Sequence, residues 1–229
     1  MRYFKFLLLF LLSNGYAQTR DEVIARVVKV YSSAEPLQYS TTYSLFKNHN
    51  DKSSIQSYKG FFCKDERSNI YLKIKNTEFL SSSKFNIKIN NDDKVIIVTD
   101  NRSVVAAQDY DIKKILNSFN AGSFRCKNGG WEIEFVSKPS SAIQYSRVIV
   151  NIGKDYFIKK QDFYYNTGFN FSKDPTKREI HYPRLEIAFS QAQRNIMSKE
   201  IFKTSNYFTE IGKGLKLTNK YKQYTILYN

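Results

Sequence analysis

Residues 85–98 read FNIKINNDDKVIIV, and this stretch decides the fold. Phe85, Ile87 and Ile89 alternate with polar residues, which is the pattern of a strand with one buried face. The following NNDD is typical of a turn, and the apolar run after it returns the chain. The stretch therefore predicts a β-hairpin.

Most of the chain on either side of this hairpin also has the pattern of strands. Short runs of apolar and β-branched residues are separated by turn signals such as Asn128-Gly129-Gly130. Because the joining turns are short, we expect neighbouring strands to be antiparallel. Residues 172–183 are charged and contain proline, which predicts a loop. The predicted strands are residues 38–46, 55–62, 69–74, 79–89, 95–98, 131–135, 142–152, 156–165, 185–189 and 224–228.

Two segments have the periodicity of a helix, and a third can form a short one. Val23 and Val27 recur at helical spacing within residues 19–33. Residues 111–120 repeat that spacing, and residues 201–211 are the third candidate. The sequence thus predicts an α+β fold, with about ten strands in a mainly antiparallel sheet covered by two or three helices. A twisted sheet of this size must curl or close.

Residues 1–17 have the three parts of a secretory signal peptide. Arg2 and Lys5 supply the positive start, residues 6–12 are an unbroken apolar run, and Ala17 suits cleavage after it. The apolar run is far shorter than the ~20 residues that span a bilayer. An uncleaved N-terminal anchor is the alternative. We expect residues 18–229 to form one exported domain, periplasmic in a cell with two membranes and secreted otherwise.

The two cysteines of an exported chain can form a disulfide. Cys63 and Cys126 would close a loop of roughly 60 residues and stabilise the fold by about 3–4 kcal/mol. The alternative is two free thiols that pack as small apolar groups. The sequence leaves both open, because it does not give the distance between the two residues.

The sequence contains none of the usual catalytic or metal-binding motifs. His49 and His181 lie in polar or charged segments, outside any spaced set of zinc ligands. No nucleophile-elbow or phosphate-binding motif occurs. Glu132 and Glu134 share one face of a predicted strand, where solvent exposure is a simpler interpretation than an acid–base pair. We therefore predict no catalytic residue, no metal site and no cofactor, in a protein that is not an enzyme.

The chain is basic, with 36 Lys and Arg residues against 21 Asp and Glu residues and a formal charge of +15. Positive charge with many aromatic residues can indicate nucleic-acid binding. Here the lysines are spread along nearly every strand and loop, so solvated strand faces are the simpler interpretation and no nucleic acid is expected. Contact with an anionic membrane surface is a second role that this charge favours.

Several strands carry large apolar side chains on both faces. The runs VIIV at residues 95–98 and FF at residues 61–62 leave neither face polar. A sheet with two apolar faces must cover both of them. Two interpretations remain open: a hydrophobic cavity between sheet and helices that holds an acyl chain, or an ordinary filled core.

Four stretches resemble the LolA/LppX-like superfamily of periplasmic lipoprotein carriers. They are the signal peptide with the helix DEVIARVVKVYSS (residues 21–33), the strand QYSTTYSLFKN (38–48), the meander YLKIKNTEFLSSSKFNIKINNDDKVIIVTDNRS (71–103) and the hairpin SRVIVNIGKDYFIKKQDFYYNTG (146–168). The resemblance covers most of the chain and rests on pattern rather than on catalytic residues. The tail after Met197 extends beyond it, and the basic residue with which classical carriers latch their lid has no match here.

The resemblance implies an incomplete β-barrel, curled like a cupped hand, with the helices as its lid. Members hold acyl chains of lipoproteins or lipids in the hollow and carry them across the periplasm without covalent chemistry. We accordingly expect a monomeric, non-catalytic carrier, with envelope proteins as further partners. The alternative is an envelope interaction or structural module with a filled core and a basic docking surface. The candidate ligand-binding residues are Phe85, Ile87, Ile89, Ile97, Trp131, Ile133, Phe135, Phe157, Phe163, Leu185, Ile187 and Phe189.

Overall fold

The computed structural model describes residues 18–100, 118–139, 143–174, 176–195, 198–212 and 214–228. Residues 1–17, the predicted signal peptide, lie outside this part of the chain, as do residues 111–117 of the second predicted helix. Within it, twelve strands form one sheet and two strand pairs form small sheets. The elements are α1 (Arg20–Ser32), β1 (Leu37–Phe46), β2 (Gln56–Lys64), β3 (Ile70–Ile74), β4 (Thr77–Ser81), β5 (Phe85–Asn90), β6 (Val95–Asp100), β7 (Phe119–Lys127), β8 (Gly130–Ser137), β9 (Tyr145–Ile152), β10 (Ile158–Tyr165), β11 (Phe169–Asn170), β12 (Ile180–His181), β13 (Arg184–Phe189), the 3-10 helices η2 (Lys199–Phe202) and η3 (Thr204–Asn206), β14 (Phe208–Ile211), β15 (Gly214–Leu217), the 3-10 helix η4 (Asn219–Tyr221) and β16 (Thr225–Tyr228).

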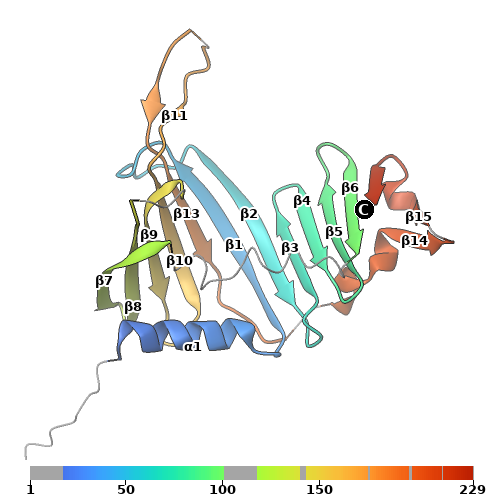
Figure 1. Cartoon of the computed structure of the whole chain (residues 1–229), viewed down its shortest axis with the longest axis horizontal. Helices are drawn as coiled ribbons and strands as arrows, with labels where there is room; N and C mark the ends of the chain where they lie inside the picture. The colour runs from blue at the N-terminus through green and yellow to red at the C-terminus, as the bar shows by residue number, and fades with distance from the viewer. Residues whose placement is uncertain are drawn as a thin grey trace, which may run out of the picture.

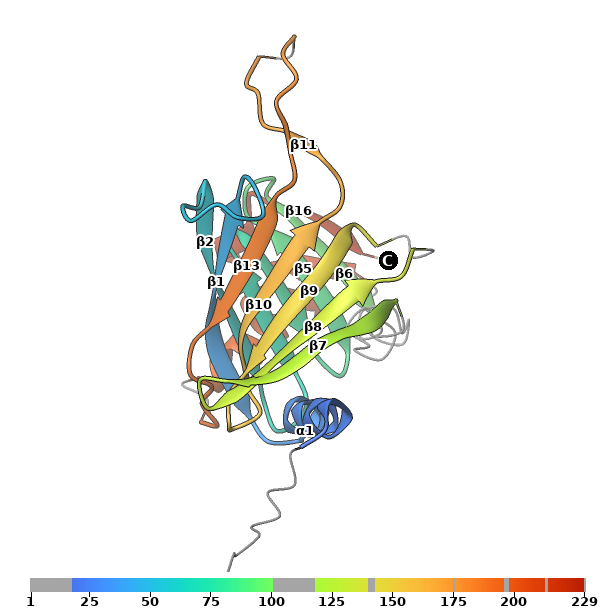
Figure 2. The same ribbon diagram turned by 90° about the vertical axis from the view of Figure 1, so that its left-hand side faces the viewer.

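The twelve-stranded sheet is open and curled. Its strand order is β16-β6-β5-β4-β3-β2-β1-β13-β10-β9-β8-β7, and every pairing is antiparallel except that of β16 with β6. The sheet curls so that the wing of β3 to β6 stands opposite the wing of β8 to β10 (Figures 1 and 2). In the described structure the edge strands β7 and β16 do not pair with each other, so the sheet does not close. The predicted curled, mainly antiparallel sheet that does not close is therefore confirmed.

The sheet has more strands than the sequence predicted. The predicted strand 79–89 is two strands, because the chain turns at Ser82, whose backbone N–H donates to the Phe85 carbonyl at 2.9 Å. Strand β7 has no counterpart among the predicted strands. It begins at Phe119, so the helix predicted for residues 111–120 is wrong at its described end.

The third predicted helix, residues 201–211, is also wrong. Its first half forms short 3-10 helices, and its second half forms β14, which pairs with β15 around Gly212. Gly212 has a φ of 58°, a left-handed conformation that glycine adopts without strain. Phe202, Tyr207 and Phe208 are all buried. Tertiary packing, rather than helical periodicity, thus decides the structure of this segment.

Hydrogen bonds define both ends of α1. The Thr19 hydroxyl accepts from the Glu22 N–H at 3.3 Å, and the Glu22 carboxylate accepts from the Thr19 N–H at 2.9 Å. At the other end, Lys64 of β2 donates to the carbonyls of Tyr31 and Ser33 at 2.8 and 2.5 Å. These last carbonyls have no partner within the helix itself. The predicted N-terminal helix is confirmed, and the sheet holds its end.

The side of the sheet on which α1 packs is called the inner face here, and the other side the outer face. Val23 and Val27, 0% and 7% exposed, pack against Ile133 of β8 and Ile152 of β9. Figure 1 shows α1 lying across one end of these strands. In the described part of the chain no helix is long and apolar enough to cross a membrane. Residues that lie opposite each other on paired strands point to the same face of the sheet. From β8 to β2 the inner face therefore includes Ile133, Val150, Gln161, Ile187, Tyr43 and Tyr58, and from β2 to β6 it includes Phe62, Leu72, Phe79, Lys88 and Ile97.

The C-terminal segment, residues 198–228, covers the outer face of the wing formed by β3 to β6. Its strand β16 pairs with β6, and its aromatic side chains pack on the outward side chains of that wing. Phe85, Ile87 and Ile89 belong to this cluster and are at most 2% exposed. The structure thus places these three candidate ligand-binding residues in a filled core, on the face opposite Ile97. Adjacent residues of a strand point to opposite faces, so Ile96 of β6 belongs to this core while its neighbour Ile97 points to the inner face.

Candidate functional site

The inner face is apolar and half-exposed, whereas the outer face of the central strands is mostly polar. On β1, Tyr39, Tyr43 and Leu45 point inward, while Ser40 and Thr42 point outward. Side chains of a filled core are buried, so a half-exposed apolar face is a candidate for binding an apolar ligand. The half-buried apolar residues of this face include Tyr39, Tyr43, Leu45, Tyr58, Phe62, Leu72, Ile74, Ile97, Phe163, Leu185, Ile187 and Phe189.

Stacked aromatic rings line the inner face where β1 and β2 meet. The ring centroids of Tyr39 and Phe62 are 4.8 Å apart, and those of Tyr43 and Tyr58 are 5.0 Å apart. Tyr39 also contacts Phe189 of β13, at 5.6 Å. Cross-strand aromatic pairs of this kind stabilise a sheet by about 0.2–1 kcal/mol each. They form an aromatic surface that faces away from the polar side of the sheet.

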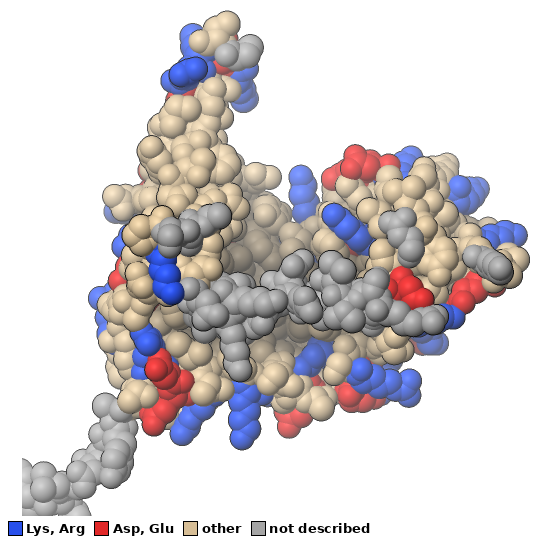
Figure 3. Space-filling view, in the orientation of Figure 1, with Lys and Arg blue, Asp and Glu red and all other residues tan. Residues whose placement is uncertain are grey.

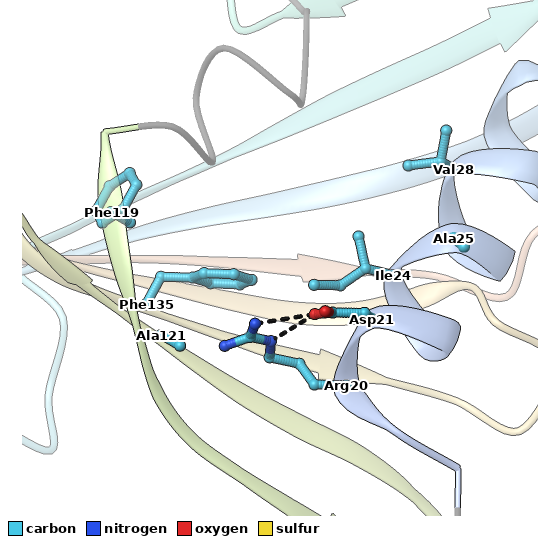
Figure 4. Close-up of a pocket in the computed structure, with 8 residues that line it drawn as sticks. All are labelled: Arg20, Asp21, Ile24, Ala25, Val28, Phe119, Ala121 and Phe135. Carbon is cyan, nitrogen blue, oxygen red and sulfur yellow. Dashed lines mark hydrogen bonds and ion pairs between the residues drawn. The ribbon is translucent and has the colours of Figure 1, made fainter.

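A cavity of about 470 Å³ lies between α1 and the β7 edge of the sheet. Figure 4 shows apolar side chains of α1 facing Phe119 and Phe135 across it. The charged groups in its lining neutralise each other, because Arg20 donates to Asp21 at 2.9 Å. The volume falls in the range of about 300–1,000 Å³ that small-molecule sites occupy. The lining residues are Arg20, Asp21, Ile24, Ala25, Val28, Phe119, Ala121 and Phe135.

The other candidate ligand-binding residues lie on or beside the inner face. Trp131 and Phe135 point to it from β8, and Ile133 between them is buried under α1. Phe157 precedes β10, and its ring lies 5.8 Å from that of Tyr31. Their contact with a ligand stays a prediction. Except for the buried Ile133, all of these candidates are half-buried: Ile97, Trp131, Phe135, Phe157, Phe163, Leu185, Ile187 and Phe189.

Sequence reasoning missed the tyrosines of the inner face and the helix residues of the cavity. Tyr39, Tyr43 and Tyr58 lie at its centre, and Ile24 and Val28 line the cavity. A signal for the first two was present, because QYSTTYSLF places tyrosine and leucine on one face of a strand and small polar residues on the other. The helix residues carried no comparable signal, since they belong to the general apolar stripe of α1.

The two cysteines do not form a disulfide in the structure. Cys63 is a buried thiol on β2, and Cys126 is an exposed thiol on β7. Five strands separate β2 from β7 in the sheet order. Burial, with the nearby Asp65 carboxylate as a smaller cause, raises the pKa of Cys63 to about 11. Of the two alternatives, the structure therefore has the free thiols, and Cys63 packs as an apolar group.

The histidines take part in structural hydrogen bonds. His49 Nε2 lies 3.0 Å from the Tyr165 carbonyl oxygen, and His181 Nδ1 lies 2.8 Å from Asn48 Oδ1. Among the residues that the structure describes, no group of three or more His, Cys, Asp or Glu side chains is placed to hold a metal ion.

A second cavity, of about 400 Å³, lies on the outer face and is polar. Glu132 and Glu134 both point to this face, but Glu132 is only 5% exposed, so its expected exposure to solvent is wrong. Arg125 and Lys127 cover the Glu132 carboxylate and donate hydrogen bonds to it. Burial alone would raise the pKa of Glu132. The hydrogen bonds from Lys127 and Arg125 outweigh burial and hold this pKa below its ordinary value of 4.5.

We expect Glu132→Gln to lower the free energy of unfolding by about 1–3 kcal/mol at pH 7. A carboxyl group with a lowered folded-state pKa stabilises the fold above its unfolded pKa, and this contribution disappears as the pH falls through the folded pKa. The difference between wild type and variant should therefore shrink as the pH is lowered below 4.5, the ordinary pKa of a glutamate. Urea unfolding at pH 7 and at a series of lower pH values measures it. Glu134→Gln is the matched control, because the Glu134 side chain is 23% exposed and should matter less. An equal loss at all of these pH values contradicts the assignment.

No protein-family model matches the chain, and no curated protein is significantly similar to it. Solved structures do match. An uncharacterized conserved protein from Thermus thermophilus has 8% identity and a TM-score of 0.49, over 93% of this chain and 100% of that one. A LolA superfamily protein from Nitrosomonas europaea has 10% identity and a TM-score of 0.36, over 82% and 99%. A DUF1329 family protein from Desulfovibrio piger has 12% identity and a TM-score of 0.37, over 80% and 95%. At these identities and TM-scores, neither a superfamily nor a site residue is carried over to this chain.

Proposed function

We propose that the inner face binds the acyl chains of lipids or lipoproteins and that the protein is a non-catalytic carrier. The observation that supports this proposal is the half-exposed apolar inner face, opposite a largely polar outer face on the same strands. An acyl chain is long, flexible and free of hydrogen-bonding groups, so it suits a surface that offers area rather than polar partners. The stacked pairs of β1 and β2 and the cavity beside α1 offer such a surface.

The proposal includes export. Residues 1–17 have the features of a cleavable signal peptide, and a carrier of acyl chains acts where those chains must cross water. In a cell with two membranes this space is the periplasm. A carrier needs no covalent step, because a ligand moves from the weaker to the tighter site when donor and acceptor differ in affinity.

Displacement of a fluorescent fatty acid tests the proposal. Wild type should bind the probe, and Ile187→Asp should bind it at least about tenfold more weakly, because the new carboxylate would lie against the acyl chain. Ile187 pairs with Tyr43 and Gln161 at the centre of the inner face. Native mass spectrometry of the purified wild type should also detect bound lipid.

Ala188→Asp is the matched control. Ala188 is the next residue of β13, is also half-buried, and points to the outer face beside Lys160. We expect it to keep wild-type affinity, and circular dichroism should show both variants folded. The proposal fails if wild type neither carries lipid nor binds the probe, or if the two variants bind it equally.

A further inference from the structure

A narrow arm projects from the curled sheet at the end opposite α1. It consists of residues 166–174 and 176–183, between β10 and β13, and carries the short strands β11 and β12. Figures 1 and 2 show it extending well beyond the strands from two directions. Two paired residues on each side are its only strand pairing in the described chain.

Contacts at its base hold the arm upright. His181 Nδ1 lies 2.8 Å from Asn48 Oδ1 in the loop between β1 and β2. Lys47 of the same loop forms an ion pair with Glu179. Within the arm, the Phe171 N–H donates to the Glu179 carbonyl at 3.0 Å. The arm is thus fixed to the sheet at its base and does not fold back over it.

Apolar side chains are exposed along the arm. Phe169, Ile180 and Tyr182 are 40%, 50% and 52% exposed. Aromatic contacts connect Phe169 to the sheet and to the rest of the arm. Its ring centroid lies 5.2 Å from that of Tyr165 in β10 and 6.5 Å from that of Phe171. Exposed groups of large apolar residues mark sites that contact another surface.

The far end of the arm is positively charged. Lys173, Lys177 and Arg178 are exposed there, and Figure 3 shows the Lys and Arg side chains gathered at this end. Asp174 pairs with Lys177 at 3.7 Å. Lys173 and Arg178 form no ion pair within the described residues. Glu179, the other acid of the arm, is engaged at the base. The end of the arm therefore offers cations that are free to meet an anionic surface.

We propose that this arm docks the protein on an anionic lipid bilayer. Aromatic and aliphatic side chains enter the interface between headgroups and acyl chains, while cations pair with the headgroups. Phe169, Ile180 and Tyr182 lie nearer the base of the arm than the cations at its far end. The arm would therefore lie along the membrane surface, so that the apolar side chains and the cations reach the interface together. Docking depends on the arm alone and not on ligand binding at the inner face.

Co-sedimentation with phosphatidylcholine vesicles, with and without phosphatidylglycerol, tests the proposal. Wild type should bind the anionic vesicles more tightly than the neutral ones, and salt should weaken this binding. A variant with Phe169→Ser, Ile180→Ser and Tyr182→Ser should bind at least about tenfold more weakly. A variant with Lys173→Gln, Lys177→Gln and Arg178→Gln should lose the preference for anionic vesicles, since each cation near such a surface contributes about fivefold.

The matched control carries Ile211→Ser and Leu227→Ser, which remove two apolar side chains of similar exposure, 58% and 48%, far from the arm. It should bind like wild type. All variants should keep fatty-acid binding, so failure of docking is distinguishable from failure of the proposed function. The proposal is overturned if wild type does not bind anionic vesicles, if the arm variants bind like wild type, or if the arm instead forms a stable complex with a second copy or another protein.

Discussion

Phe208→Ala is expected to lower the free energy of unfolding by about 3–5 kcal/mol. Phe208 begins β14 of the C-terminal segment and is 2% exposed. Its ring meets that of Phe85 edge-on, with centroids 5.4 Å apart. Truncation removes this aromatic contact and leaves a cavity that the surrounding strands cannot fully close. Urea unfolding at neutral pH measures the loss.

Ile211→Ala provides the control for this prediction. Ile211 ends the same strand but is 58% exposed, so its truncation should cost well under about 1 kcal/mol. If Phe208→Ala were as mild as Ile211→Ala, the C-terminal segment would be a peripheral addition rather than part of the core.

The position of this segment bears on where a ligand can bind. The outer face of the wing of β3 to β6 is apolar and needs cover, whereas its inner face mixes apolar side chains with Asn86, Lys88 and Asn90 of β5. The C-terminal segment fills the outer face with residues such as Phe202, Tyr207 and Tyr221. The outer face of this wing is therefore part of a filled core made by the chain itself. The inner face of the same wing keeps half-exposed side chains such as Leu72 and Ile97. Of the two interpretations that the sequence left open, the filled core thus has a counterpart on the outer face of this wing. A ligand on the inner face stays a prediction.

Sequence reasoning succeeded where structure is local. The hairpin of residues 85–98 was predictable because a polar turn joins two runs of strand-forming residues, and β5 and β6 pair around that turn. The helix at residues 19–33 was predictable from its spacing and its first-turn acids. Both elements satisfy their hydrogen bonds mainly within a short stretch of chain, so their sequences carry most of the information.

Sequence reasoning failed where partners are distant in the chain. The face to which Ile87 or Ile97 points depends on strand register and on which segment covers each face. The cover of Ile87 comes from residues more than one hundred positions later, and no local pattern shows it. Strand β7 escaped prediction for a similar reason. Asn120 to Ser123 lack apolar alternation, and the strand is held in the sheet by residues on either side of a bulge, 119–121 and 124–127, which pair with β8.

Val23→Asp is expected to detach α1 from the sheet and to lower the free energy of unfolding by about 3 kcal/mol or more. Val23 is fully buried against Ile133 and Ile152, so the variant places a charge without a partner in an apolar cluster. Trp131 is the only tryptophan of the chain and belongs to the same cluster, where its ring stacks on Tyr156 at 5.0 Å. Its fluorescence emission should therefore shift to the red when the helix undocks, even if the sheet stays folded.

Ala25→Asp adds the same charge to an exposed position of α1 and should leave the emission and the stability close to wild type. Unchanged Trp131 emission in Val23→Asp would contradict the packing of α1 described above. Val23→Asp also locates the proposed ligand, whereas Ala25 itself lines the cavity and Ala25→Asp is a control for the emission and the stability alone. Because residues of α1 line one side of the cavity, a fatty acid held there should be lost when the helix detaches. A fatty acid that remains bound to Val23→Asp must instead rest on the aromatic surface of β1 and β2, which does not need the helix as a wall.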